Sequence, residues 1–220
     1  MTDIFHEVQE DLRRERLQRL WTRYGWLIVA VAVLLVAAAG GWRGYEYWQA
    51  RQAEAAGDRY QAAARLAEEG KADEAKAAFA ELAANAPAGY QALARLREAA
   101  EVVKSDPAAA LKLYEAVAND SAADALLRDA ARVRAGYVAV DHASRDEVRK
   151  LVEALAVDNG PWRQAAREVL GLAAYKAGDL VDARRQFEAL VSDPETGQGA
   201  RQRADLMLSV MPAAAAAPAK

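Results

Sequence analysis

The chain has 220 residues, with 29 lysines and arginines against 32 aspartates and glutamates, which gives a net charge of −3 at pH 7. It has no cysteine and two histidines. This composition excludes disulfide bonds, thiol catalysis and thiolate zinc sites, and a slightly acidic chain is a poor binder of nucleic acid. Alanine, leucine and charged residues dominate while glycine and proline are sparse, which predicts an all-α protein.

The most informative early segment is an uncharged run of 19 residues from Tyr24 to Trp42, bounded by Arg23 and Arg43. A helix of about 20 apolar residues crosses the hydrocarbon core of a bilayer. The sequence therefore predicts a transmembrane helix at residues 24–42, with the lipid bilayer as a partner. Aromatic rings favour the boundary between lipid and water. They form a membrane-interface belt at Trp21, Tyr24, Trp26, Trp42, Tyr45, Tyr47 and Trp48.

The arginines near this run predict its orientation. Residues 4–23 before the run contain five arginines, and residues 43–62 after it contain three. Because the more basic flank stays in the cytoplasm, residues 1–23 are predicted as a short cytoplasmic segment and the rest of the chain as exported. Apolar residues recur at roughly helical spacing in residues 1–23, so this segment is either an amphipathic helix at the membrane surface or a solvated helix.

A cleaved signal peptide is the alternative explanation of the apolar run, since Ala37-Ala38-Ala39 resembles a cleavage site. However, the apolar run is longer than the usual 7–15 residues, and a signal peptide has no use for the aromatic residues that follow it. Both interpretations export most of the chain. The natural setting is the inner membrane of a bacterial cell with a periplasm, crossed once with the N-terminus in the cytoplasm.

A repeated pattern then runs through the rest of the chain. A small or branched residue is followed four positions later by a large one, and the large residues are 35, 38 and 35 positions apart. The pairs are Ala75 with Phe79, Ala110 with Tyr114, Val148 with Val152, and Ala183 with Phe187. This period predicts tetratricopeptide-like units of two antiparallel helices. Gly136 and Gly171, themselves 35 apart, are predicted as the small partners on the preceding helices.

The expected fold class is all-α, with an N-terminal transmembrane helix followed by a tetratricopeptide-like helical-hairpin solenoid. The repeat domain is expected at residues 43–210, and the proline- and alanine-rich residues 211–220 are expected to be a disordered tail. Only Gly57 interrupts the first helix, which can continue directly from the span. The expected helices cover residues 43–69, 71–86, 88–104, 106–119, 122–142, 145–157, 161–177, 179–192 and 197–210.

No catalytic constellation is found in the sequence. His6 and His142 fall on opposite sides of the predicted membrane, and the carboxylates stand where acids cap helices. Phosphate-binding, zinc-protease and calcium-loop motifs are missing from the sequence. We therefore expect a protein that is not an enzyme and has no cofactor or metal.

A solenoid instead offers a concave surface lined by the first helix of each hairpin. Tyrosines on such a surface can anchor a peptide or a partner helix. Ordinary packing residues have the same spacing, so both interpretations stay open. The repeat register places near this candidate groove Tyr60, Val133, Tyr137, Val140, Leu172, Tyr175 and Lys176.

The order of parts resembles a known family. Leu20-Trp21 precedes the span, Gly41-Trp42-Arg43 and Tyr47-Trp48 follow it, and repeats complete the chain. This arrangement is similar to that of the YfgM-like ancillary subunits of the bacterial Sec translocon. The resemblance implies a periplasmic domain that associates with Sec translocon subunits and with a membrane-anchored periplasmic chaperone of the peptidyl-prolyl isomerase type. It implies no catalytic residues.

Two functions therefore follow as expectations. The first is a membrane-anchored interaction module that assists exported proteins at the Sec channel. The alternative is a general cell-envelope scaffold for division or outer-membrane assembly, because tetratricopeptide arrays serve many processes and a fold does not fix a function.

Overall fold

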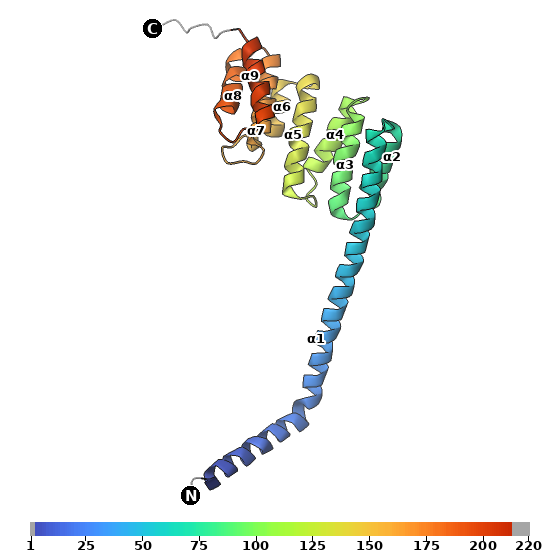
Figure 1. Ribbon diagram of the computed structural model, residues 1–220, viewed down its shortest axis with the longest axis vertical. Coiled ribbons are helices and arrows are strands. Elements are labelled where there is room, and N and C mark those ends of the chain that lie inside the picture. Colours follow the sequence, from blue (N-terminus) through green and yellow to red (C-terminus); the bar gives the residue numbers. More distant parts are fainter. Residues whose placement is uncertain (1–2, 213–220) are drawn as a thin grey trace, which may run out of the picture. The chain divides into compact units, whose positions relative to one another are not determined.

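The computed structural model describes the backbone of residues 3–212 and the side chains of residues 21–212 apart from Ile28. In this part of the chain all regular secondary structure is helical, which confirms the predicted all-α fold (Figure 1). The chain divides into two compact units, residues 1–52 and residues 53–220. The side chains that would test the amphipathic character of residues 1–23 lie mostly outside the described residues.

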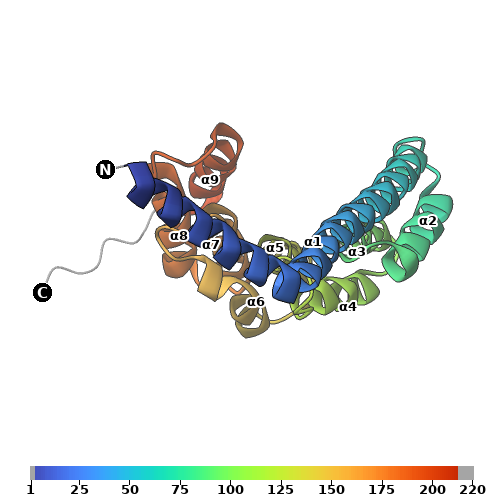
Figure 2. The same ribbon diagram turned by 90° about the horizontal axis from the view of Figure 1, so that it is seen from below.

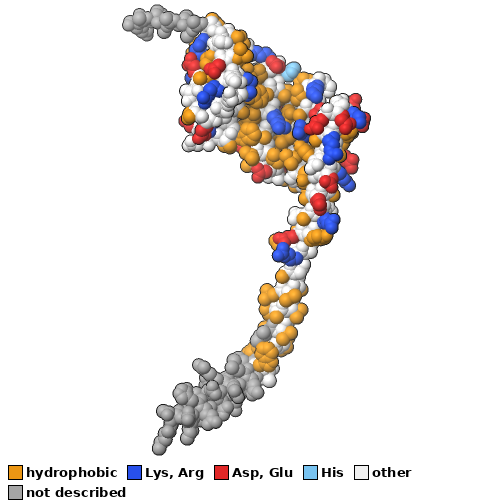
Figure 3. Space-filling view, viewed as in Figure 1, with side chains coloured by type: hydrophobic (Ala, Val, Ile, Leu, Met, Phe, Trp, Pro, Cys, Tyr) orange, Lys and Arg blue, Asp and Glu red, His pale blue; other side chains and the backbone are white. Residues whose placement is uncertain are grey.

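Helix α1 extends over Asp3–Glu68. Its part up to residue 52 forms the first unit, and its last turns belong to the second unit. Among the described residues, α1 supplies one stretch that is long and apolar enough to cross a membrane. Its side chains are exposed, Val36 by 73% for example. Figure 3 shows hydrophobic side chains covering this stretch and charged side chains following it. The structure has no break after residue 42, so the expected helix 43–69 continues directly from the predicted span.

The second unit continues with helices that closely match the expected ranges. The largest differences are the later start of α5 and the end of α6, which finishes in the 3₁₀ turn η1. The elements are α2 (Ala72–Asn85), α3 (Ala88–Val102), α4 (Pro107–Ala118), α5 (Ala125–His142), α6 (Arg145–Val152), η1 (Glu153–Leu155), α7 (Arg163–Lys176), α8 (Leu180–Ser192) and α9 (Gln198–Val210).

Consecutive helices pair into antiparallel hairpins that stack in chain order within this unit (Figures 1 and 2). The last turns of α1 pair with α2, followed by α3 with α4, α5 with α6, and α7 with α8. Helix α9 packs on α8 and α7 and closes the stack. The odd-numbered helices α3, α5 and α7 are the first members of their hairpins and line one side of the stack.

The eight residues of the repeated pattern form the core of the stack. All of them are at most 3% exposed. Phe79, Tyr114, Val152 and Phe187 each lie in a separate apolar cluster together with residues of the preceding and following helices. The repeat seen in the sequence is therefore a repeat of packing.

Glycine on the preceding helix makes this packing possible in the last two hairpins. A Cβ atom at Gly171 would lie 2.9 Å from the ring of Phe187, and one at Gly136 would lie 2.8 Å from Val152 Cγ1. The two predicted small partners are thus confirmed. In the second hairpin Glu98 occupies the equivalent place and is half-buried, and burial raises the pKa of its carboxyl.

Short polar side chains cap the starts of α4, α5, α6 and α8. Asp106 accepts from the amide of Ala109 in front of α4, where Pro107 fills the first position. Ser144 and Glu147 form a reciprocal capping box at α6, as their spacing predicts. Helix α2 has no side-chain cap, and the preceding turn is made by Gly70, whose φ of +78° favours glycine.

The segment after α9 begins inside the core. Met211 is 4% exposed and belongs to the cluster around Phe187, and the carbonyl of Pro212 accepts from Arg184. The remaining tail residues, 213–220, lie outside the described residues.

Arginine side chains form ion pairs between separate elements of the stack. Arg145 links the third hairpin to the fourth, whereas Arg95 and Arg163 each link the first helix of a hairpin to the segment after its second helix. Each reaches a carboxylate that follows it by 25 to 37 positions in the sequence. The pairs are Arg95 with Asp120 (2.9 Å), Arg145 with Asp179 (2.9 Å) and Asp182 (2.6 Å), and Arg163 with Asp193 (2.9 Å) and Glu195 (2.6 Å). Hydrogen bonds from Arg163 hold the pKa of Asp193 below its usual range, so this link is complete at neutral pH and weakens as the pH falls through that pKa.

The contact between Gly171 and Phe187 gives a prediction about stability. Replacing Gly171 by alanine should lower the free energy of unfolding by about 1 kcal/mol, because overpacking outweighs the better helix propensity of alanine. The matched control is Gly89→Ala in α3, where a Cβ has no neighbour within 4 Å and alanine should be neutral or stabilising. Thermal unfolding of both variants in detergent, followed by circular dichroism, compares them. A Gly171→Ala protein at least as stable as the unmodified chain would contradict the packing argument.

Candidate protein-binding surface

Five of the seven residues predicted to line a groove lie together on two neighbouring first helices. Helix α5 contributes Tyr137 and Val140, and α7 contributes Leu172, Tyr175 and Lys176. We call these five residues the α5–α7 surface. Tyr137 is 37% exposed and Tyr175 is 38% exposed, so part of each ring is open to a partner.

Two hydrogen bonds hold the α5–α7 surface together. Lys176 Nζ donates to the carbonyl of Val140 over 2.8 Å and lies 3.7 Å from the carboxylate of Asp141. The hydroxyl of Tyr137 donates to Glu168 of α7 over 3.0 Å. Each bond joins α5 to α7, so the two helices present their side chains in a fixed relation.

The other two predicted residues, Tyr60 and Val133, are not part of this surface. Tyr60 of α1 is half-buried, packs edge-on against Phe79 with ring centres 5.5 Å apart, and accepts from Arg97 Nε over 3.2 Å. It therefore helps to pack the first hairpin against α3. Val133 is 4% exposed, so its side chain is part of the interior and offers little surface to a partner.

A buried residue that the sequence argument did not select joins the helices of this surface. Glu168 of α7 is 5% exposed. Its carboxylate accepts from Arg203 Nε of α9 over 2.6 Å and from Arg203 Nη2 over 2.7 Å, in addition to the hydroxyl of Tyr137. One buried carboxylate thus joins α5, α7 and α9.

A signal for this ion pair is present in the sequence. Arg203 follows Glu168 by 35 positions, which is the repeat period, so the two residues occupy equivalent places on α7 and on the closing helix α9. Burial raises the pKa of Tyr137 well above its usual value, and the charge of Glu168 raises it further. Tyr137 therefore remains a neutral hydrogen-bond donor across the physiological pH range.

The part of the chain whose side chains the structure describes holds no cluster that could bind a metal ion. No group of three or more histidine, cysteine, aspartate or glutamate side chains gathers there. His142 is exposed in the last turn of α5, and His6 lies outside the described side chains. Several carboxylates instead cap helices, as those of Asp106 and Asp124 do.

The aromatic residues that flank the predicted span are exposed on α1. Two of them form a hydrogen bond with the residue four positions later on the helix. Trp42 donates to Glu46 over 2.8 Å, and Tyr47 accepts from Arg51. The remaining members are also between 46% and 72% exposed, namely Trp21, Tyr24, Trp26, Tyr45 and Trp48.

The buried carboxylate of Glu168 can be tested directly. Glu168→Gln should lower the free energy of unfolding by about 1.5–3 kcal/mol, since hydrogen bonds to a charged group are lost inside the stack. The matched control is Asp158→Asn, because Asp158 pairs with Arg167 but is 91% exposed, and loss of an exposed pair costs about 1 kcal/mol at most. Urea unfolding of both variants gives the comparison. Equal losses would show that Glu168 does not act as a buried link between the helices.

A family model described as a tetratricopeptide repeat-like domain matches residues 18–208. The match begins before the apolar stretch of α1 and extends into α9. A comparison with curated proteins gives no match, and neither does a comparison with solved structures. Because the matched range covers most of the chain, the protein belongs to the tetratricopeptide repeat-like domain family.

Proposed function

We propose that this protein is a membrane-anchored interaction module that associates with the Sec translocon of a bacterial inner membrane and assists exported proteins. The observation that carries the proposal is the combination of an apolar helix able to span a membrane with a tetratricopeptide-like stack. Such stacks are typically protein-binding modules rather than catalysts.

The proposed topology has residues 1–23 in the cytoplasm and the repeat unit in the periplasm. Its support is the larger number of arginines before the span than after it. The exposed aromatic residues at both ends of the span fit the two interfaces of a bilayer.

The α5–α7 surface is the proposed place of contact. Exposed tyrosines on a rigid support bury a large area at small entropic cost, which is why aromatic residues dominate binding hot spots. Tyr137 is fixed by Glu168, and Lys176 is fixed by Val140, so the surface is largely formed before a partner arrives.

The proposed partners follow from the resemblance to YfgM-like subunits. They are subunits of the Sec channel and a membrane-anchored periplasmic chaperone of the isomerase type. Anchoring in the same membrane raises the effective concentration of both partners, so weak contacts on the repeat unit suffice.

The topology can be tested because the chain has no native cysteine. Single-cysteine variants Asp3→Cys and Val181→Cys are treated in intact spheroplasts with a maleimide that does not cross membranes. Val181 is 83% exposed on α8, so this site should be labelled at once, whereas Asp3→Cys should be labelled only after lysis. Labelling in the opposite order would place the repeat unit in the cytoplasm and overturn the proposal.

The association can be tested by co-purification. The intact chain with a C-terminal tag is extracted from its own membranes in mild detergent, and its companions are identified by mass spectrometry. We expect Sec channel subunits and a tethered isomerase, with recovery of at least one of them reduced about tenfold or more by the double variant Tyr137→Ser and Tyr175→Ser, as for loss of two hot-spot aromatics. Val181→Ser is the control on α8 and should leave recovery unchanged.

Other outcomes of this experiment are equally informative. Division or outer-membrane assembly proteins in place of Sec subunits would favour a general envelope scaffold. Recovery of Sec subunits that is insensitive to the double variant would retain the association and assign the contact to another surface.

A further inference from the structure

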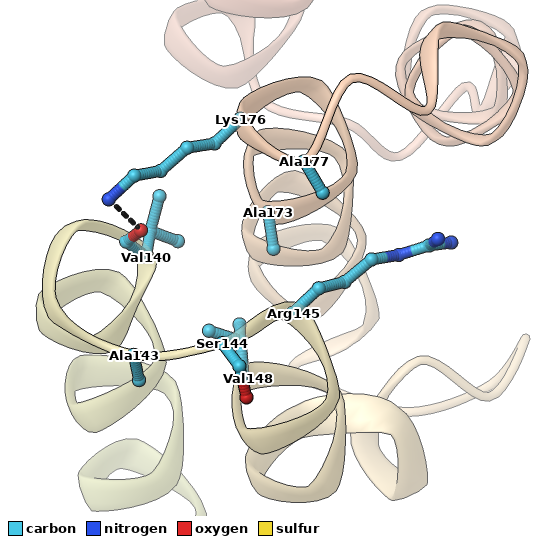
Figure 4. Close-up of a pocket in the computed structure, with 8 residues that line it drawn as sticks. All are labelled: Val140, Ala143, Ser144, Arg145, Val148, Ala173, Lys176 and Ala177. Carbon is cyan, nitrogen blue, oxygen red and sulfur yellow. Dashed lines mark hydrogen bonds between the residues drawn. The ribbon is translucent and has the colours of Figure 1, made fainter.

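A pocket lies at one end of the α5–α7 surface, where the turn between α5 and α6 meets the last turn of α7 (Figure 4). Its volume is about 250 Å³. Val140 and Lys176 belong both to the pocket lining and to the α5–α7 surface. A partner that covers this surface therefore reaches the mouth of the pocket.

The pocket is lined mainly by small apolar side chains. Val148 and Ala173 are at most 4% exposed and form its inner part. Ala177 is exposed at the end of α7, so the pocket is open to solvent on that side. The apolar lining consists of Val140, Ala143, Val148, Ala173 and Ala177. Such a lining favours a branched aliphatic group.

The charged side chains that line the pocket are both positive. None of its eight lining residues is acidic, and two are cationic. Arg145 is already paired with Asp179 and Asp182, and Figure 4 shows its guanidinium pointing away from the alanines. The hydroxyl of Ser144 is used in the capping box.

Lys176 is the cation that remains available to a ligand. Figure 4 shows its side chain crossing from α7 to the carbonyl of Val140. An ammonium group has three donors, and its side chain here is 48% exposed. The ammonium also lies 3.7 Å from the exposed carboxylate of Asp141, so an anionic group at the pocket mouth can take the place of Asp141 while Lys176 keeps the carbonyl of Val140.

We propose that this pocket binds an aliphatic side chain of a partner protein that carries a carboxylate beside it, with Lys176 binding the carboxylate. The inference rests on the proposed function in so far as the ligand is part of a protein. It names the chemistry of one contact: a leucine-like group among the alanines and valines, and an acid at the ammonium of Lys176.

The test attaches small thiols next to the pocket of the full chain in detergent micelles. Ala177→Cys supplies the only thiol of the protein. Four fragments are supplied one at a time as mixed disulfides with 2-mercaptoethanol: those of mercaptoacetyl-leucine, its amide, mercaptoacetyl-alanine and mercaptoacetyl-phenylalanine. The introduced thiolate attacks the mixed disulfide and 2-mercaptoethanol leaves, and added 2-mercaptoethanol keeps this exchange reversible. The captured fraction is read from the mass of the intact protein.

We expect mercaptoacetyl-leucine to be captured about tenfold more than mercaptoacetyl-alanine, since its isobutyl group is removed from water. It should exceed its own amide about threefold, as for a partly exposed ion pair. Adding Lys176→Gln should abolish the difference between acid and amide and keep the preference for leucine. Adding Ala143→Leu, which fills the pocket, should remove the preference for leucine.

The control is Val181→Cys on α8, which should capture all four fragments equally. Equal capture of leucine and alanine at Ala177→Cys would overturn the aliphatic part of the proposal, and preferred capture of phenylalanine would replace it by an aromatic ligand. Equal capture of the acid and the amide would overturn the role of Lys176. Because no partner protein is present, failure here is distinct from failure of Sec subunits to co-purify.

Discussion

The last two hairpins of the stack depend on one contact, a large side chain of the second helix pressed against a glycine of the first. At Gly171 and Gly136 there is no room for a Cβ atom, because Phe187 and Val152 fill that space. This contact fixes how closely the two helices approach and which faces meet, so it also determines which residues remain outside. The positions of Tyr137, Leu172 and Tyr175 on the α5–α7 surface follow from it.

Most of the fold could be predicted because its determinants are local in the sequence. The small-then-large pair recurs at a nearly constant period, and short polar caps such as Asp106 and Ser144 stand at the helix starts. Both signals are read within a few residues, and the structure follows them closely. The apolar stretch of α1 is equally local. Val133 shows the limit of local prediction. Helical spacing placed it near the candidate groove, but the packing of neighbouring helices buries its side chain.

The ion pair between Glu168 and Arg203 and the pocket could not be predicted in the same way, because each is formed by residues about one repeat apart. The chain has 32 acidic residues, and nothing adjacent to Glu168 marks it as the one that Arg203 binds. Its partner becomes visible only when residues are compared at the repeat period of 35. The pocket is harder still, since it needs the ends of α5, α6 and α7 together.

The alanine-rich repeats explain why these ionic links lie where they do. Alanine lets helices approach closely but buries little apolar surface, so each hairpin has only two to four buried apolar side chains larger than alanine in its core. Arginine links add fixed contacts in the part formed by α5–α9. Arg145 joins α6 to α8, Arg163 joins α7 to the segment after α8, and Arg203 joins α9 to α7. That part also carries the α5–α7 surface and the pocket. A surface held in place by such links loses less conformational freedom on binding, so a weak apolar contact there yields more affinity than the same contact on a looser hairpin.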